Sequence, residues 1–378
     1  MITRIYSNID KLLKTNPVLI IYGPRQVGKT TLLTKYLETT KYKYRFDKGD
    51  YITVQEVLSS KNKSMITDFI GDNDLIVIDE AQMIKDIGQN LKIIADDFPN
   101  TKVIVSGSAS IALADRIEEP LTGRKTTVTL YPFSQLELLK FQFNNNKFDL
   151  KESLDSFLIF GAYPKIYLSK TKEEKIRELN ELVSGYLIKD VLEIEGIRAS
   201  NVVFNLLRLL AFQVGSEVSF RELGEKLNID SRTIAKYMDL LEKAFVIFHL
   251  GGFSTNLRNN VTNKNKYYFI DNGIRNAVIS QYNNLNMRDD IGKLWENFII
   301  SERMKKRAYT NDYAIPYFWR NYSQQEIDLI EQKDGHLFAY EFKWSNTKTP
   351  KIPSQWKKEY PESEFKIINK DNYLDFVI

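Results

Sequence analysis

The chain has 378 residues, too many for one ordinary hydrophobic core, so we expect about two to four domains. Its 43% hydrophobic and 27% charged residues are typical of a folded protein, and a formal charge of +4 confines any nucleic-acid contact to a local patch. The absence of cysteine excludes disulfides and cysteine-bound zinc, and with only His249 and His336 we do not expect histidine-rich metal sites or Ser-His-Asp catalysis.

The amino-terminal residues 1–17 predict a polar helix and lack the apolar core of a signal peptide. No run in the sequence approaches the roughly twenty apolar residues of a membrane span. We therefore expect a cytoplasmic protein without a membrane partner.

A phosphate-binding loop follows. The apolar run Val18–Tyr22 predicts a buried parallel strand, and Gly23-x-x-x-x-Gly28-Lys29-Thr30 comes next, leading into a helical pattern. Glycines let backbone N–H groups curl around phosphates, and the helix N-terminus adds its positive end. Lys29 is expected to reach the β- and γ-phosphates of ATP, and the Thr30 hydroxyl to ligate Mg²⁺. The alternative is a chance match on a glycine turn. The residues expected to contact the nucleotide are Gly23, Pro24, Arg25, Gln26, Val27, Gly28, Lys29, Thr30 and Thr31.

A second buried strand, Leu75–Ile78, ends in Asp79 and Glu80. Parallel α/β sheets place their chemistry at the carboxyl ends of strands. Asp79 suits the Walker-B role of holding Mg²⁺, and Glu80 is placed to activate the attacking water, which favours hydrolysis over binding alone. The alternative is a pair of acids that close a strand and cap a helix.

A third strand ends in Ser106, Gly107 and Ser108, and Arg124 follows on a glycine turn. A polar side chain beside the γ-phosphate would sense the nucleotide state. Ser106 or Ser108 could fill that role, or the segment could be a simple turn. Arg124 could stabilise transition-state charge in cis or from a neighbouring subunit, or it could be an ordinary surface arginine.

The segments "GPRQVGKTTL", "LIVIDEAQ", "SGSAS" and "LTGR", in this order, resemble a group of prokaryotic AAA+-superfamily ATPases. Members of this group join the ATPase to a winged-helix segment and to a carboxyl-terminal domain like the PD-(D/E)xK nucleases. The resemblance implies ATP and Mg²⁺ as ligands.

The middle of the chain is helical by pattern. Residues 134–200, interrupted at 144–147 and 161–165, are expected to form a lid. In 216–250, Ser219 with Glu222 predicts a capping box, and Ser231 is expected to cap a second helix that runs to Ala244. Two helices followed by strands describe a winged helix-turn-helix. If this segment binds nucleic acid, the residues that would face DNA are Arg232, Thr233 and Lys236. The alternative is an architectural or protein-binding role.

From about residue 285 an amphipathic helix places Leu294, Trp295, Phe298 and Ile299 inward, with Glu296 at the edge of that stripe. Further along the chain, the segments "PYFWRN" and "QEIDLIEQKDGHLFAYEFKW" predict strands, with a turn at Gly335. Ile327 and Leu329 are expected to point one way and Asp328 the other, toward the face of Glu341 and Lys343. In the strict alternation of "FAYEFKWS" the aromatic residues are expected to build the core.

The order of these residues resembles the PD-(D/E)xK nuclease core: Glu296 on the helix, then Asp328, then Glu341-x-Lys343. One difference is that Ile327 stands in place of the proline of the motif. Under this resemblance Glu296, Asp328 and Glu341 would ligate a divalent metal ion and Lys343 would position water or stabilise charge. The alternative is an exposed strand face with a Lys–Glu pair. The basic run 303–307 could bind phosphate, or be a solvated helix face.

We therefore expect an α/β chain with a P-loop NTPase core on a parallel sheet (1–133), a helical lid (134–200), a winged helix (201–275) and a restriction-endonuclease-like α/β domain (285–378). Two hypotheses describe its function. In one, ATP state controls binding or cleavage of DNA or RNA by the end domain. In the other, the chain is a regulatory switch whose rear domains bind a protein partner or a second copy.

Overall fold

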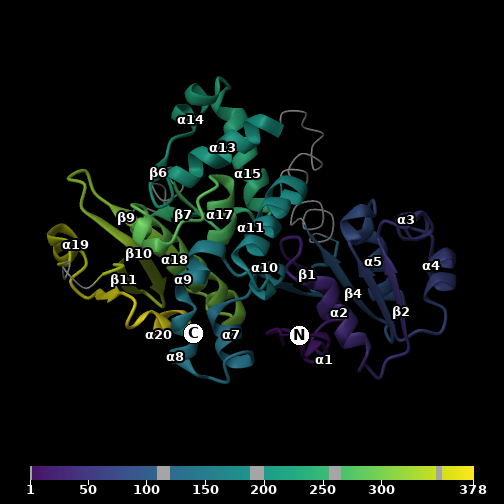
Figure 1. The fold of residues 1–378 in the computed structure, drawn as a ribbon. Coiled ribbons are helices and arrows are strands. Elements are labelled where there is room, and N and C mark those ends of the chain that lie inside the picture. The colour runs from purple at the N-terminus through teal and green to yellow at the C-terminus, as the bar shows by residue number, and fades with distance from the viewer. Residues whose placement is uncertain (1, 109–119, 188–199, 255–264, 346–350) are drawn as a thin grey trace. The chain divides into compact units, whose positions relative to one another are not determined.

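The computed structural model describes residues 2–108, 120–187, 200–254, 265–345 and 351–378 (Figure 1). These residues form two compact units. The first contains the chain up to Pro132 together with Lys243–Phe245, and the second contains Phe133–Glu242 and Val246–Ile378. Parts of the predicted lid (188–199) and winged helix (255–264) lie outside the described residues.

The first unit is built on a parallel sheet with strand order β2-β3-β4-β1-β5. Its strands are β1 Val18–Tyr22, β2 Tyr44–Lys48, β3 Leu75–Asp79, β4 Lys102–Gly107 and β5 Lys125–Thr129. Its helices are α1 Ile9–Leu13, α2 Lys29–Leu37, α3 Ile52–Ser59, α4 Lys63–Ile70, the 3₁₀ turn η1 Ala81–Met83, and α5 Ile87–Asp97. The predicted polar helix over residues 1–17 is thus a single short helix.

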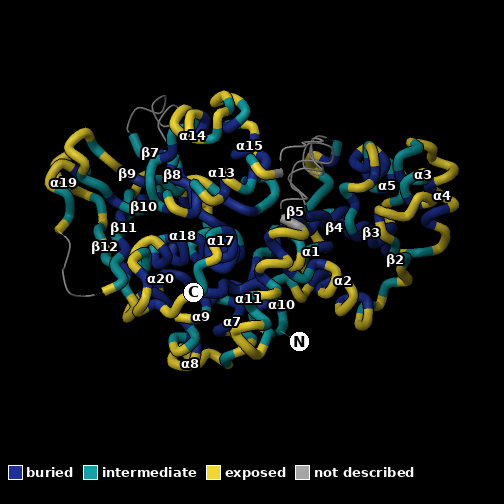
Figure 2. Tube along the Cα trace, turned by 45° about the horizontal axis from the view of Figure 1, so that its top comes forward, coloured by how far each residue is buried: buried dark blue, intermediate teal, exposed yellow. Residues whose placement is uncertain are grey.

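The three central strands of this sheet are buried almost throughout, as the dark blue tube in Figure 2 shows. Alternate strand residues such as Ile20, Ile78 and Val105 pack with apolar residues of α3, α4 and α5 in one hydrophobic cluster. Continuous apolar runs are required because both faces of such a sheet are covered. The predicted parallel core is confirmed, and it brings the ends of β1, β3 and β4 to one edge.

The second unit contains a seven-stranded sheet with the order β12-β11-β10-β9-β7-β8-β6 in the described part of the chain. Its strands are β6 Glu217–Val218, β7 Ile247–Gly252, β8 Asn265–Phe269, β9 Ile315–Arg320, β10 Glu326–Lys333, β11 His336–Phe342 and β12 Glu364–Ile368. Its helices are α7 Gln135–Phe141, α8 Lys147–Glu152, α9 Leu154–Phe160, α10 Pro164–Leu168, α11 Lys172–Glu181, the π-helix η2 Leu182–Leu187, α13 Ser200–Phe212, α14 Phe220–Leu227, α15 Ser231–Lys243, α17 Asn272–Val278, η3 Leu285–Met287, α18 Ile291–Thr310, α19 Ser354–Glu359 and α20 Tyr373–Val377. Among the helices described, none combines the length and apolarity needed to cross a bilayer.

One sheet joins two regions that the sequence pattern separates. Gly251 and Gly252 of β7 pair in parallel with Tyr317 and Phe318 of β9. The strands of the predicted winged helix and those of the predicted end domain are therefore continuous, and both regions belong to the same compact unit. The four-part division stays a prediction, but 201–275 and 285–378 are not structurally independent.

A β-bulge changes the expected alternation in β10. The register with β9 shifts between Ile327 and Ile330, and these two residues, three apart, join the same cluster with Trp319 and Trp356. The prediction that Ile327 and Leu329 share a face is therefore wrong, because the bulge inserts an extra residue. The aromatic face of β11 does build the core, since Tyr340 and Phe342 pack on Phe376.

The other face of β11 is not an open surface. Ala339 is fully buried and packs in the cluster that contains Trp356 of α19. Covering helices thus lie on both faces of this strand. The alternative of an exposed strand face with a Lys–Glu pair is therefore met only in part: Ala339 is covered, whereas Lys343 is partly exposed and pairs with Glu341.

Helix α17 is a buried hub of the second unit. All of its residues are buried, and Asp271 caps it by accepting the N–H groups of Gly273 at 2.8 Å and Ile274 at 3.4 Å. The other Asp271 oxygen accepts the Ala162 N–H at 2.8 Å, so α9 and α17 are joined by one carboxylate. Gly161 lies against it with φ +71°, and an added Cβ would lie 1.8 Å from Asp271 Oδ1.

We expect Gly161→Ala to lower the free energy of unfolding of the second unit by about 3 kcal/mol, because the methyl group collides with a buried carboxylate in a backbone conformation that favours glycine. All 4 tryptophans of the chain lie in this unit, so tryptophan fluorescence in urea measures it selectively. Gly292→Ala is the matched control. A Cβ there meets nothing within 4 Å, and alanine should stabilise the helix by up to about 1 kcal/mol. Equal stability of the two variants would contradict the proposed contact.

Candidate functional site

The loop between β1 and α2 is shaped by close backbone contacts. Gly23 has φ +150°, and a Cβ there would lie 2.1 Å from the Leu130 carbonyl oxygen, so only glycine fits. The Lys29 side chain is 5% exposed, and its Nζ donates to the carbonyl oxygens of Gly23 at 2.8 Å and Pro24 at 2.9 Å. The ammonium group is thus held inside the loop that the sequence predicts to hold phosphates.

The Asp79 carboxylate is the centre of the site. It is 2% exposed at the end of β3, and Thr30 Oγ1 donates to its Oδ2 at 2.6 Å. Ser106, at the end of β4, donates its hydroxyl to the other oxygen, Oδ1. Side chains from α2, β3 and β4 therefore meet at the carboxyl edge of the sheet. Hydroxyl and carboxylate oxygens are ligands that suit Mg²⁺, so the donor set fits the ion that the sequence predicts.

Glu80 is oriented by a residue that the sequence analysis did not single out. Gln82 Nε2 donates to Glu80 Oε2 and, at 3.1 Å, to Ser108 Oγ. The two candidate sensor serines are thereby distinguished: Ser106 contacts Asp79, whereas Ser108 contacts Gln82. The position of Gln82 within "DEAQ", two residues after Glu80, is the signal that could have identified it.

Arg4 is a second residue that the sequence analysis missed. Its buried guanidinium donates to the Val27 carbonyl oxygen at 2.6 Å and to the Tyr131 carbonyl oxygen at 2.6 Å. It therefore joins the phosphate-binding loop to the end of β5. No local pattern indicates this, because its partners lie 23 and 127 residues away.

Arg124 lies at the opposite edge of the sheet. Its carbonyl oxygen accepts the N–H of Val18, the first residue of β1, whereas the phosphate-binding loop follows the last residue. The length of β1 separates them by roughly 16 Å. The side chain is partly exposed and pairs with Asp96 of α5. Action in cis on the phosphates is therefore wrong for Arg124. The pair with Asp96 fits the alternative of an ordinary surface arginine, and action on a neighbouring subunit stays a prediction.

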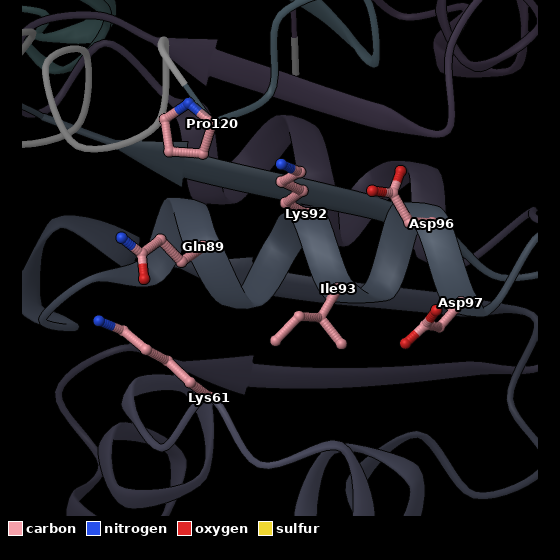
Figure 3. Close-up of a pocket in the computed structure, with 7 residues that line it drawn as sticks. All are labelled: Lys61, Gln89, Lys92, Ile93, Asp96, Asp97 and Pro120. Carbon is pink, nitrogen blue, oxygen red and sulfur yellow. The ribbon is translucent and has the colours of Figure 1, made fainter.

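A hollow of about 730 Å³ lies along the outer side of α5 (Figure 3). Lys61, Gln89, Lys92, Ile93, Asp96, Asp97 and Pro120 line it. None of the predicted site residues belongs to this set. The hollow is a feature of the α5 surface near the Asp96–Arg124 pair and not of the phosphate-binding loop.

The acids predicted for the end domain lie near enough to one another that the charge of one affects the pKa of the next. Burial raises the pKa of the Asp328 carboxyl well above its usual range, and the charges of Glu296 and Glu341 raise that pKa further. Burial also raises the pKa of Glu296, against the lowering effect of the nearby Lys266 ammonium group. Asp328 Oδ2 accepts the Phe342 N–H at 2.8 Å, which joins β10 to β11.

The groups around these acids are cations and a hydroxyl. Lys343 Nζ lies 2.6 Å from Glu341 Oε1, and Tyr268 donates its hydroxyl to Glu296 Oε1 at 2.8 Å. Lys266 also lies among these acids, 3.7 Å from Glu296 Oε1. Within the described ranges, no three acidic or histidine side chains are arranged so that they could hold one metal ion.

The basic run of α18 has neither predicted role. Arg303 forms two hydrogen bonds with the buried Glu331, at 2.9 and 2.6 Å, and Lys306 donates to the Phe376 carbonyl oxygen at 3.1 Å. Lys305 is 2% exposed and pairs with Glu302 at 2.7 Å. Both the phosphate-binding interpretation and the solvated-face interpretation are wrong, since these cations tie α18 to its own unit.

The helix pair α14 and α15 differs in its caps from the prediction. Ser219 caps α14 by accepting the Glu222 N–H at 3.4 Å, which is one half of the predicted capping box, whereas the Glu222 carboxylate accepts from Lys226 at 2.6 Å. For α15 the cap is Asp230 and not Ser231, because its Oδ1 accepts the N–H groups of Arg232 at 2.9 Å and Thr233 at 3.0 Å. The Arg232 and Lys236 side chains are exposed at the front of this helix.

Three protein-family models match the chain in succession. A model described as an AAA domain matches residues 15–139. Two domains of unknown function, DUF8612 and DUF4143, match residues 151–286 and 291–376. The AAA match contains Lys29, Thr30, Asp79 and Ser106, so the site described above lies within the part of the chain that is similar to an AAA domain.

Curated relatives match nearly the whole chain without a described activity. An uncharacterised protein of Mycobacterium tuberculosis is 24% identical over 350 residues, which cover 92% of this chain and 74% of that protein. One of Haemophilus influenzae is 22% identical and covers 96% of this chain and 89% of its own length. Among solved structures, the Walker-type ATPase of Pyrococcus abyssi is 18% identical, with a TM-score of 0.49, over 72% of this chain and 93% of that one.

We expect Arg4→Met to weaken nucleotide binding and to destabilise the first unit by about 2 kcal/mol, because two buried carbonyl groups lose a charged donor. Fluorescent ATP-analogue titration and thermal unfolding followed by circular dichroism measure the two effects. Lys14→Met, an exposed position just after α1, is the control and should change neither. Unchanged affinity in Arg4→Met would show that this arginine does not support the loop.

Proposed function

We propose that the protein binds Mg²⁺–ATP in the first unit and hydrolyses it, acting as a nucleotide-dependent switch for the second unit. One observation carries this proposal. The hydroxyls of Thr30 and Ser106 hold both oxygens of the buried Asp79, beside the loop that encloses Lys29. This is the set of groups that positions phosphates and a hydrated Mg²⁺.

Each residue has a role in this chemistry. Lys29 exchanges its two carbonyl partners for the β- and γ-phosphate oxygens, and Thr30 with Asp79 would hold Mg²⁺. When bound, Mg²⁺ neutralises charge that develops on the phosphates. Glu80 accepts the proton of the attacking water as the bond between the γ-phosphorus and ADP breaks. Gln82 fixes the Glu80 carboxylate and links it to Ser108, whose hydroxyl faces the same edge of the sheet.

For the second unit we propose a winged helix continuous with a PD-(D/E)xK-like fold. The succession of α18, the antiparallel strands β9, β10 and β11, then α19 and a parallel β12 supports this assignment. The exposed Arg232 and Lys236 are the candidate contacts to DNA or RNA. The pairing of the end-domain acids with lysines favours a module that binds a nucleic-acid or protein partner over one that cleaves nucleic acid.

We expect Lys29→Ala to abolish ATP binding, because the loop loses the cation that faces the phosphates. Glu80→Gln should retain ATP binding and lower the hydrolysis rate by about 10²- to 10⁴-fold, because the amide cannot accept the proton of water. Equilibrium binding and phosphate release, measured on the same preparations, separate the two effects.

Glu56→Gln, a change of the same kind on α3 outside the site, is the control and should hydrolyse ATP normally. If Lys29→Ala hydrolysed ATP at the normal rate, the assignment of the first unit as the ATPase would be wrong.

We also propose that Arg124 acts on the nucleotide of a neighbouring copy. It lies at the amino edge of the sheet on a partly exposed surface, where Asp96 holds its guanidinium. A guanidinium brought to the γ-phosphate by a second copy would stabilise transition-state charge. The proposal implies that hydrolysis requires self-association.

We expect Arg124→Ala to bind ATP normally and to hydrolyse it about 10³-fold more slowly. Mixing Arg124→Ala with Lys29→Ala should restore part of the activity, because each inactive chain supplies what the other lacks. Lys92→Ala, on the same surface, is the control and should remain active. No recovery in the mixture, together with activity that is independent of protein concentration, would refute a role in trans.

A further inference from the structure

Lys266 is a buried cation that neither the predicted site nor the proposed ATPase uses. It belongs to β8, in the region predicted as the winged helix, and its side chain is 1% exposed. A buried ammonium group is costly unless acids and hydrogen-bond acceptors surround it. The groups that surround Lys266 therefore indicate the role of its ammonium group.

The partners of Lys266 come from the end domain. Its Nζ donates to Glu326 of β10 and lies 3.7 Å from Glu296 Oε1 of α18. The Phe318 ring of β9 lies 5.2 Å away and covers the ammonium group. Tyr268, two residues further along β8 on the same face, donates to Glu296. One strand thus brings both a cation and a hydroxyl to the acids.

The remaining acids of the cluster are also held by protein groups. Lys343 pairs with Glu341 at 2.6 Å, and Arg320 Nε lies 3.5 Å from Glu326 Oε2. Asp328 accepts a backbone N–H, at 2.8 Å, through Oδ2. Carboxylate oxygens that already accept from ammonium and guanidinium groups do not fit a divalent ion, because two cations would then compete for one set of ligands.

We propose that Lys266 is the resident cation of this acidic cluster and takes the role that the sequence resemblance assigns to a divalent metal ion. Its ammonium group neutralises Glu296 and Glu326 and ties β8 to α18 and β10. The end-domain cluster is thereby a metal-free site with its own counter-ions. This inference is independent of ATP hydrolysis, which concerns the first unit alone.

Metal titration of protein with an intact end-domain cluster decides the question directly. Nucleotide-free protein carrying Asp79→Asn, which removes the metal ligand of the first unit, is titrated with MnCl₂ by calorimetry. We expect no Mn²⁺ binding, and no change in the melting temperature of the tryptophan signal with either MnCl₂ or EDTA. Binding of one Mn²⁺ per chain that Glu341→Ala abolishes, or Mn²⁺-dependent nicking of DNA or RNA, would overturn the proposal.

Removal of the lysine provides the converse test. In the same Asp79→Asn protein, Lys266→Ala should melt about 5 °C lower or more and should gain a Mn²⁺ site, because unpaired acids then surround a vacated volume. Adding Glu296→Gln should abolish that gain. Lys266→Met, which fills the volume, should lose stability without gaining Mn²⁺.

Lys226→Ala provides the matched control, because Lys226 pairs with Glu222 at 2.6 Å on the exposed face of α14. It should change neither property. Lys266→Ala that melts like the wild type, or folds without gaining Mn²⁺, would contradict the proposal. If Lys266→Ala does not fold, the titration of the Asp79→Asn protein alone decides.

Discussion

The organisation of the first unit depends on one buried carboxylate that is held from two sides. Asp79 closes β3, and hydroxyls from α2 and β4 occupy its two oxygens. This arrangement is possible only where parallel strands end together, because parallel pairing brings the carboxyl ends of β1, β3 and β4 to one edge. The site therefore depends on the apolar strand runs, since the pairing of these strands sets the relative positions of the polar residues that follow them.

The strands and helices of the first unit, including those that flank the candidate nucleotide site, could be predicted from sequence wherever short-range pattern determines structure. The apolar run before Gly23, the helix after Lys29 and the acids after Ile78 follow from local periodicity and motif spacing, and all lie where expected. The helix and hairpin of the end domain were predictable for the same reason. The prediction became unreliable where one extra residue changes the register, as at the β10 bulge, because alternation alone does not reveal an insertion.

Long-range charge pairing accounts for most of what sequence could not provide. Arg4, Lys266 and the basic run of α18 look like ordinary surface cations in sequence, yet each is wholly or largely buried against partners far away in the chain. The free energy of such a group depends on which acid or carbonyl group lies opposite, and that is determined by tertiary packing. A cation within an otherwise apolar strand, such as Lys266 in "NKYYF", is the one local sign that burial with a partner is required.

The parallel contact between β7 and β9 has an evolutionary consequence. The strands meet over Gly251–Tyr317 and Gly252–Phe318, while β8, α17 and α18 lie between them in the chain. A parallel connection of this kind needs a long crossover, and here the crossover contains the hub helix and the lysine that faces the acids. A break in the chain at residues 275–285 would therefore leave β8 and β9, which belong to one sheet, on different pieces. Any recombination there would separate β8 from the carboxylates it neutralises, so these two regions are expected to be inherited together.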